Sequence, residues 1–261
     1  MDFRCFGRVA SRACAMLTLL FSSSLLAGSS NAVTIDFEFL AHGEVANGTV
    51  DFITISAINF HRSFDYAVGF DSHAHGTADP DLQASGGAMQ WSGGNIAGQN
   101  LGTLLILQER SAGCSTGVCS RPDDEGRRPA GVLRFDFSTP VLDFGFDAVD
   151  IESLDAENAT IEFFGGGETA TVHLMDFFDP TSPLYDPTLM LGNNTANQFA
   201  PITAEFLDLS QIEYVKFELG GSGALDNLEI TPIPEPTTAL LTILGLGAMV
   251  ATRRITPSSL A

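Results

Sequence analysis

An alternation of phenylalanine and aspartate in the middle of the chain limits the fold more than any other feature. The apolar positions are Leu133, Phe135, Phe137, Leu142, Phe144 and Phe146, and the polar positions between them are Arg134, Asp136, Asp143 and Asp147. A period of two places successive side chains on opposite faces of a strand. Ser138-Thr139-Pro140 separates the two runs. The pattern therefore predicts a β-hairpin with its phenylalanines in the core and its aspartates toward solvent.

The rest of the body consists of similar short apolar runs between glycine-containing turns. Strands are expected at residues 33–39, 49–60, 68–70, 104–108, 160–164, 169–174, 202–206, 212–219 and 224–230. In the first of these, Ile35, Phe37 and Phe39 would share the buried face. No convincing amphipathic helix accompanies the strands. The sequence thus predicts an all-β protein, a jelly-roll-like antiparallel β-sandwich.

Residues 71–100 show neither the strand nor the helix period and are expected to form a long loop. The single tryptophan, Trp91, lies in this loop. An exposed Trp91 would suit stacking on a sugar ring, and a buried one would suit a hydrophobic plug under the loop. The sequence leaves both interpretations open.

Two groups of polar residues are candidates for a metal site or a catalytic site. His73 and His75, with Asp71 and His61 nearby in sequence, could ligate a transition metal because alternate residues of an extended segment share a face. A glycine-rich loop holds ligands poorly, so structural or incidental histidines are preferred. Asp123-Asp124-Glu125 is predicted to be a solvated charge run, since a glycosidase needs two carboxyls across a cleft rather than adjacent in one loop.

Residues 1–32 are predicted to be a secretory signal peptide, which would engage the Sec machinery. Arg4, Arg8 and Arg12 form a basic region, and a short apolar stretch at 15–26 follows. The small residues Ser30-Asn31-Ala32 suit a cleavage site. The body, residues 33–231, is then long enough for one domain with its own core.

Charge and cysteine content limit the partners and the compartment. The chain has 12 basic and 32 acidic residues. Nucleic-acid binding is disfavoured because little would neutralise phosphates. Cys114 and Cys119 are the two cysteines outside the signal peptide, and in an oxidising compartment they are expected to form a disulfide that closes the loop between them.

The C-terminus carries a second targeting segment. Pro234-Glu235-Pro236 precedes an uncharged apolar stretch at 239–251, and Arg253-Arg254 follows it. The stretch predicts one membrane-spanning helix at the short end of the usual length, with the arginines on the cytoplasmic side. Residues 255–261 would be a short cytoplasmic tail.

This order of parts, at residues 232–254, resembles the PEP-CTERM sorting signal of exported bacterial proteins. The resemblance implies recognition by an exosortase, a membrane transpeptidase, with Pro234, Glu235 and Pro236 as the recognition element and Arg253 and Arg254 as the stop. The protein would be anchored transiently in the inner membrane and then passed to the cell surface or outside the cell. An ordinary single-pass anchor is the alternative.

The body itself resembles a module that recurs in PEP-CTERM proteins. The similarity rests on Asp79–Gln83, Leu104–Glu109, the Phe-Asp-Phe strand at 135–137 and the glycine-rich Gly220–Ile230. Such modules are similar to galactose-binding-like, carbohydrate-binding sandwiches. The resemblance implies a β-sandwich and makes extracellular polysaccharide a candidate partner.

Calcium is the most specific cofactor hypothesis, although an acidic exported body also suits simple solubility. In lectin-like sandwiches one calcium ion often ties the first strand to the last. Asp36 or Glu38 near the start and Asp226 near the end are the matching oxygen donors, with Asp79 and Asp81 from the loop as further candidates. In the alternative interpretation, Asp226 caps the preceding glycine turn through backbone N–H groups.

Together these features predict a non-enzymatic, exported envelope or matrix protein. No nucleophile, phosphate-loop or metalloprotease motif is found in the sequence. The alternatives are a secreted hydrolase acting on matrix polysaccharide and a purely structural surface protein.

Overall fold

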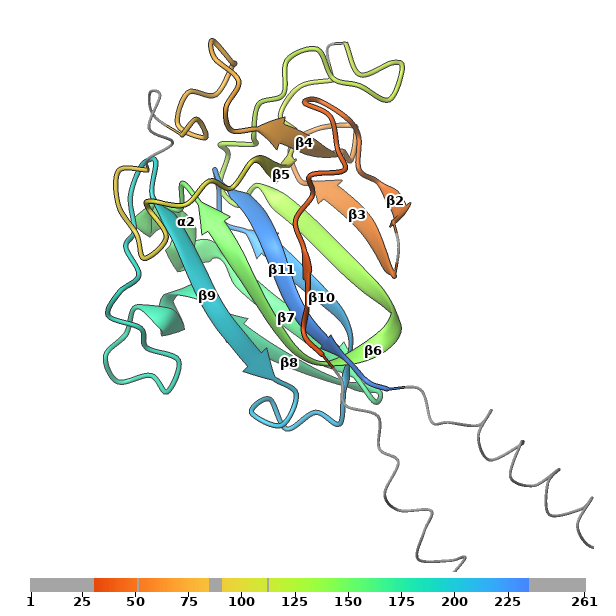
Figure 1. Cartoon of the computed structure of the whole chain (residues 1–261), viewed down its shortest axis with the longest axis vertical. Coiled ribbons are helices and arrows are strands. Elements are labelled where there is room, and N and C mark those ends of the chain that lie inside the picture. The colour runs from red at the N-terminus through yellow and green to blue at the C-terminus, as the bar shows by residue number, and fades with distance from the viewer. Residues whose placement is uncertain (1–30, 51, 85–90, 112, 235–261) are drawn as a thin grey trace, which may run out of the picture. The chain divides into compact units, whose positions relative to one another are not determined.

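The fold is organised around β6 (Gly131–Val149), one continuous strand of 19 residues. The computed structural model describes residues 31–50, 52–84, 91–111 and 113–234. The predicted turn at Ser138-Thr139-Pro140 is wrong, because the chain stays extended there and β6 changes partners instead (Figure 1). Its first half pairs with β3 and β10, and its second half pairs with β11 and β9. Pro140 is tolerated at this bend, where a missing N–H interrupts little of the ladder.

The change of partners on β6 divides a single curled sheet into two layers. The first layer contains β2 (Gly48–Val50), β3 (Ile53–Asn59), the first half of β6, β10 (Ile212–Leu219), β7 (Thr160–Gly165) and β8 (Glu168–His173). The second contains β9 (Ala196–Thr203), the second half of β6, β11 (Ala224–Pro232), β1 (Val33–Ile35), β5 (Thr103–Leu107) and β4 (Ala67–Asp71). All pairs between these strands are antiparallel.

The all-β prediction is confirmed at this level, and a β-sandwich fits the two layers; the jelly-roll type stays a prediction. Two short helical turns accompany the strands, α2 (Ser153–Asn158) and the 3-10 helix η2 (Leu174–Phe177). The predicted hairpin around residues 165–167 is present as β7 and β8. The strand expected at 49–60 is a hairpin of β2 and β3, and the one expected at 202–206 lies earlier, as β9.

Phenylalanines from both layers fill the space between them, as the alternating pattern predicts. The ring centroids of Phe146 and Phe199 lie 4.6 Å apart, and those of Phe146 and Phe217 lie 4.8 Å apart. Phe135 and Phe144 are fully buried. Each such ring removes a large apolar area from water and gains from edge-to-face and stacked packing with its neighbours.

The predicted facing of side chains fails beyond the bend in β6. Leu142 was expected in the core but is 40% exposed, and Val141 takes the core position. Asp147 was expected to face solvent but is only 2% exposed. For Asp147 the cause is that residues 144–149 are all buried, so both faces of this end of β6 are covered.

The first strand is also shorter than predicted. β1 ends at Ile35, and Phe37 has a left-handed backbone with φ of 44°. This break in the period leaves Phe37 fully buried and turns Phe39 outward, where it is 45% exposed. The residues after Ile35 are therefore not paired with β11, and their side chains no longer alternate.

The long loop after β4 builds a second, smaller core over β4 and β5. Phe70, Leu82, Trp91, Leu101 and Leu104 are among its buried members. Trp91 is only 5% exposed, and its Nε1 donates a hydrogen bond to the carbonyl oxygen of Gln99 at 3.2 Å. The buried-plug interpretation of Trp91 is correct, and stacking of an exposed Trp91 on a sugar ring is excluded.

Candidate metal centre

Acidic residues from three segments lie near one another where β1 ends beside the β6–β11 pair. Asp226 on β11 is the register partner of Asp147 on β6. Their side chains are buried, with 0% and 2% of each residue exposed, while Asp36 and Glu38 lie at the surface just beyond β1. We call these four residues the first acidic cluster.

The hydrogen bonds within the first acidic cluster leave one oxygen of each buried carboxylate without a donor. Asn227 interrupts the ladder with a φ of 44°. Its Nδ2 donates to Asp147 Oδ2 at 2.8 Å and to Asp226 Oδ2 at 3.2 Å. The Oδ1 atoms of Asp147 and Asp226 are buried and have no hydrogen-bond partner. Such atoms are costly unless a proton or a cation reaches them.

The electrostatics of the cluster follow from this burial. Burial raises the pKa of Asp226 to about 9, and the charges of Asp147, Glu38 and Asp36 add to the shift. Burial likewise raises the pKa of Asp147 to about 6, against the hydrogen bond from Asn227, which lowers it. Both shifts show that the folded protein disfavours the charged forms in the absence of a cation.

Of the residues predicted to bind calcium, Asp36 and Glu38 lie near enough to Asp226 for their charges to raise its pKa. Whether the three share an ion stays a prediction. Asp147 was missed, because the alternation assigned it to solvent. The alternative in which Asp226 caps the glycine turn is not what the structure shows, since the N–H of Gly223 donates to Asp124 Oδ2 at 2.5 Å. Glu38 also has a structural contact, since its Oε1 accepts a hydrogen bond from the N–H of Thr103 at 2.6 Å.

The other two predicted calcium ligands, Asp79 and Asp81, belong to a different place in the fold. The pKa of Asp150 is raised to about 7, first by burial and then by the charges of Asp79 and Asp81. Asp79 also faces Asp124, whose pKa is raised well above its usual value by burial and then by Asp79. We call Asp79, Asp124 and Asp150 the second acidic cluster. Asp150 follows Asp147 by three residues, about 10 Å along an extended chain.

The prediction that Asp123-Asp124-Glu125 is a solvated charge run is wrong. The three residues are 8%, 7% and 1% exposed. Asp123 Oδ2 lies 2.8 Å from Arg110 Nε, and Glu125 Oε2 lies 2.8 Å from Arg62 Nε. A run of adjacent charges can be buried when each has its own partner, which composition alone does not reveal.

The histidines do not converge. His61 Nε2 lies 2.7 Å from the carbonyl oxygen of Pro129, and His73 Nδ1 lies 3.7 Å from Asp71 Oδ1. His75 instead lines a surface hollow beside His42. Among residues 31–50, 52–84, 91–111 and 113–234, no three His, Cys, Asp or Glu side chains are grouped so as to hold a metal ion by themselves.

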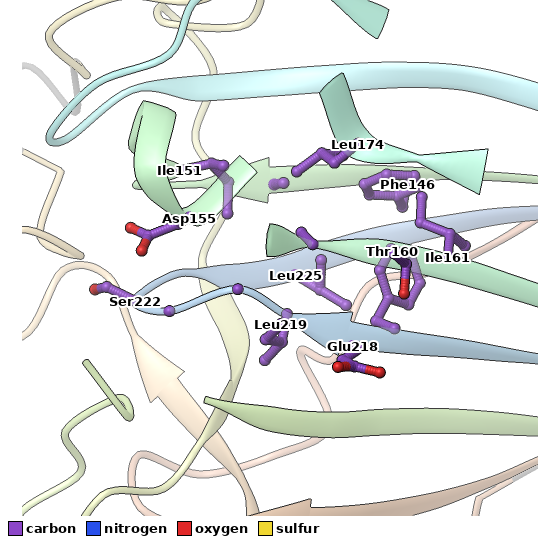
Figure 2. Close-up of a pocket in the computed structure, with 15 residues that line it drawn as sticks. Phe146, Ile151, Asp155, Thr160, Ile161, Leu174, Glu218, Leu219, Ser222 and Leu225 are labelled. Carbon is purple, nitrogen blue, oxygen red and sulfur yellow. The ribbon is translucent and has the colours of Figure 1, made fainter. Parts of the chain in front are cut away.

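Two hollows differ in what they could accept. The apolar pocket in Figure 2, between α2 and the start of β11, has a volume of about 20 Å³, room for about one water molecule. A groove of about 310 Å³ lies beside β9. It is lined by Tyr185, which is 40% exposed, and by Asp186, with Phe177 and Ile202 also in its wall. Its size is that of a small-ligand site.

The disulfide predicted between Cys114 and Cys119 is confirmed. The signal peptide and the sorting segment lie almost entirely outside the described residues. Of the sorting motif, Pro234 is described and exposed, while Glu235, Pro236, Arg253 and Arg254 are outside. In the portion of the chain that the structure covers, no helix has the length and apolarity needed to span a membrane. The predicted span at 239–251 is not in that portion.

Comparison with known proteins adds one distant similarity. No family model matches the chain, and no curated protein matches it. The crystal structure of the K2 cleaved adhesin domain of Lys-gingipain matches with a TM-score of 0.38 and 12% sequence identity, over 77% of this chain and 99% of that one.

Proposed function

We propose that the protein is an exported, non-catalytic surface module, of jelly-roll type, whose sandwich is held together by calcium at the first acidic cluster. One observation carries the proposal: Asp226 and Asp147 are buried as a pair, each with an Oδ1 that no donor reaches. Asp36 and Glu38 are exposed, and their charges act on Asp226. A calcium ion would join the end of β1 to β6 and β11.

Calcium suits this donor set better than a transition metal. All the available ligands are oxygens, and calcium accepts six to eight of them from carboxylates, carbonyls and water. The side chains alone do not form a three-ligand group, so backbone carbonyls and water would complete the coordination sphere. Sites of this kind in extracellular modules bind calcium with dissociation constants on the order of 10⁻⁴–10⁻³ M.

Export is the second part of the proposal. The Cys114–Cys119 disulfide supports it, because disulfides persist mainly in oxidising compartments. In this proposal the Sec machinery exports the chain, the C-terminal helix anchors it in the inner membrane, and an exosortase-like transpeptidase cuts near Pro234. Intact-mass analysis of the exported protein tests both cleavages, since an unprocessed mass would overturn this route.

Extracellular polysaccharide is the proposed ligand, and the groove beside β9 supports it. An exposed tyrosine next to a carboxylate can pack against a sugar ring and accept hydrogen bonds from its hydroxyls. Tyr185 and Asp186 provide this pair. On a glycan array, Tyr185→Ala is expected to lose binding while its melting temperature is unchanged. Turnover of chromogenic glycosides by the unmodified protein would favour the alternative, a secreted hydrolase.

The calcium proposal is tested by melting the protein in calcium and in chelator. Millimolar calcium is expected to raise the melting temperature, and Asp226→Asn is expected to reduce that response. Asn is close in shape to a protonated Asp, so the variant should fold and melt normally in chelator. Glu168→Gln, at the exposed start of β8, is the control and should keep the full response. An Asp226→Asn protein that responds to calcium as the unmodified one does would overturn the proposal.

A further inference from the structure

The second acidic cluster joins four separate segments at the start of β11. Asp79 comes from the loop after β4, and Asp124 from the segment after the disulfide. Asp150 directly follows β6 and has a left-handed backbone with φ of 61°. Ser222 and Gly223 form the turn between β10 and β11, and Figure 2 shows the Ser222 side chain directed away from the apolar pocket.

All three carboxylates of the cluster are buried. Asp79, Asp124 and Asp150 are 7%, 7% and 4% exposed. The Ser222 hydroxyl lies 2.8 Å from Asp124 Oδ2 and 3.2 Å from Asp150 Oδ2. A hydroxyl has one proton to donate, so it satisfies only one of the two carboxylates at a time.

The remaining donors leave one buried carboxylate oxygen of the cluster without a hydrogen bond. The N–H of Asn194 donates to Asp150 Oδ1 at 2.6 Å, and the N–H of Asp81 donates to Asp79 Oδ1 at 3.0 Å. Asp79 Oδ2 is buried and has no hydrogen-bond partner. The Asp79 carboxyl nevertheless lies against that of Asp124. Two carboxylates form a hydrogen bond only if one of them holds a proton.

Among the described residues, no ion pair joins an arginine to this cluster. Arg121 and Arg127, three residues on either side of Asp124, are exposed, and three other arginines are paired with other acids. Arg110 pairs with Asp123 and Glu109, Arg62 pairs with Glu125 and Glu109, and Arg128 pairs with Asp155 and Glu152. Three buried carboxylates, two of them joined by the Ser222 hydroxyl, are an all-oxygen donor set with a formal charge of −3 when all three are ionised. A hard divalent cation fits that set in both charge and ligand type.

We propose that the second acidic cluster is a calcium site separate from the first, formed by Asp79, Asp124, Asp150 and the hydroxyl of Ser222. The unpartnered Asp79 Oδ2 is the ligand that the ion recruits. In the described residues no three carboxylates are already grouped around one point, so this proposal requires the side chains to rearrange when the ion binds. This site goes beyond the proposed function, which needs only the first cluster.

Calcium at this site would fasten the long loop to the sandwich. The side-chain amide of Asn194 already donates to the carbonyl oxygens of Asp81 and Gln83, each at 2.8 Å. Asn194 also donates its N–H to Asp150. An ion held between Asp79 and Asp150 would add a second tie between the same two segments, and so order the covering of the second core.

Calcium titration calorimetry on the full-length protein, freed of metal with chelator, tests the inference. The unmodified protein is expected to bind two calcium ions. Asp79→Asn and Asp150→Asn are each expected to bind one, and Asp226→Asn is also expected to bind one. In Asp79→Asn and Asp150→Asn the amide oxygen can replace Oδ1, which accepts a backbone N–H in each case. In Asp226→Asn it can replace Oδ2, which accepts from Asn227, so all three variants should fold. Asp124→Asn is avoided because Asp124 caps the β10–β11 turn.

The outcomes separate the two sites. Asp79→Asn and Asp150→Asn proteins that still bind two ions would overturn the second site. If Asp226→Asn still binds two ions and Asp79→Asn binds one fewer, the first site is wrong and the second stands. If the unmodified protein binds a single ion that Asp226→Asn alone abolishes, only the first site exists. Circular dichroism of each variant, with Glu168→Gln as control, confirms that a lost ion is not lost folding.

Discussion

Asp124 and Glu125 are adjacent and both buried, yet they differ in the groups that surround their carboxylates. Glu125 accepts hydrogen bonds from Arg62 Nε at 2.8 Å and from Asn59 Nδ2 at 3.2 Å. Among the described residues, Asp124 accepts hydrogen bonds from the neutral groups Ser222 and Gly223, and after burial it is the charge of Asp79 that raises its pKa. One carboxylate has a built-in cation, and the other does not.

The same contrast recurs elsewhere in the sandwich. Asp155, 1% exposed, is paired with Arg128, whereas Asp226, 0% exposed, faces Asp147. A buried carboxylate with its own arginine is a fixed part of the fold. One that faces another carboxylate depends on what the solution supplies, either a proton or a metal ion. A buried acid therefore indicates a ligand site only where no arginine or lysine of the protein is paired with it.

Arg62→Ala is expected to give the largest effect, because it leaves Glu125 buried and unpaired. Breaking a buried ion pair from one side costs about 3–5 kcal/mol. We expect the lower end, about 3 kcal/mol, because the Arg62 side chain is 23% exposed while that of Glu125 is 0% exposed. In a thermal melt this is a fall of about 6–12 °C, and calcium should not restore it.

Arg127→Ala provides the matched control, since Arg127 is exposed and lies two residues from Glu125. Its melting temperature should stay near that of the unmodified protein. If calcium restored the melting temperature of Arg62→Ala fully, buried acids with an arginine partner would not differ from those without one.

Much of the fold could be predicted because strands leave a period in the sequence. The phenylalanines of β6, the β7–β8 hairpin and the disulfide were all indicated by local pattern. The bend in β6 was not, because Ser138-Thr139-Pro140 has the composition of a turn and only the pairing of β6 with four other strands keeps it extended. Tertiary contacts overrode local turn chemistry there.

The candidate sites were less predictable, since they depend on contacts between distant segments. Sequence reasoning singled out Asp226 because its parity matches Leu228 and Ile230, and it is indeed buried. The sequence predicted Asp79 and Asp226 as ligands of one calcium ion, although they lie in different clusters. It missed Asp124, Asp147 and Asp150, because acidic residues are by default exposed and nothing local to them indicates burial.

Calcium is expected to give the next largest effect. A ligand present at ten times its dissociation constant stabilises a protein by about 1.4 kcal/mol for each site, or about 3 kcal/mol for two. The corresponding rise in melting temperature is about 6–12 °C for two sites. Asp79→Asn and Asp226→Asn should each keep about half of this rise, and the double variant should keep none. A full rise in the double variant would place calcium outside both clusters.

Over a single pH unit, the pH dependence in chelator should be a smaller effect, and its sign is unusual for an acid. A carboxyl whose folded pKa is raised stabilises the fold below its unfolded pKa and loses that contribution as pH rises through the folded value. For Asp226 the folded pKa is about 9 and for Asp150 about 7. Between pH 6 and 7, Asp226 alone should cost about 1.4 kcal/mol of stability. Melts from pH 5 to 8 should fall with pH in chelator and become flat in calcium, while equal slopes in both would contradict cation binding.

Arg110→Ala is expected to give the smallest effect, although Arg110 neutralises Asp123 as Arg62 neutralises Glu125. Arg110 Nε lies 2.8 Å from Asp123 Oδ2, but half of the Arg110 side chain, 49%, is exposed. Asp123 itself is only 8% exposed, but water can reach it from the open side that the Arg110 side chain occupies. A pair that is open on one side contributes less to stability than one that is closed on both. The melting temperature should change by no more than about 2 °C. A fall as large as that of Arg62→Ala would contradict this reasoning. It would show that a buried carboxylate depends on its arginine however exposed that arginine is.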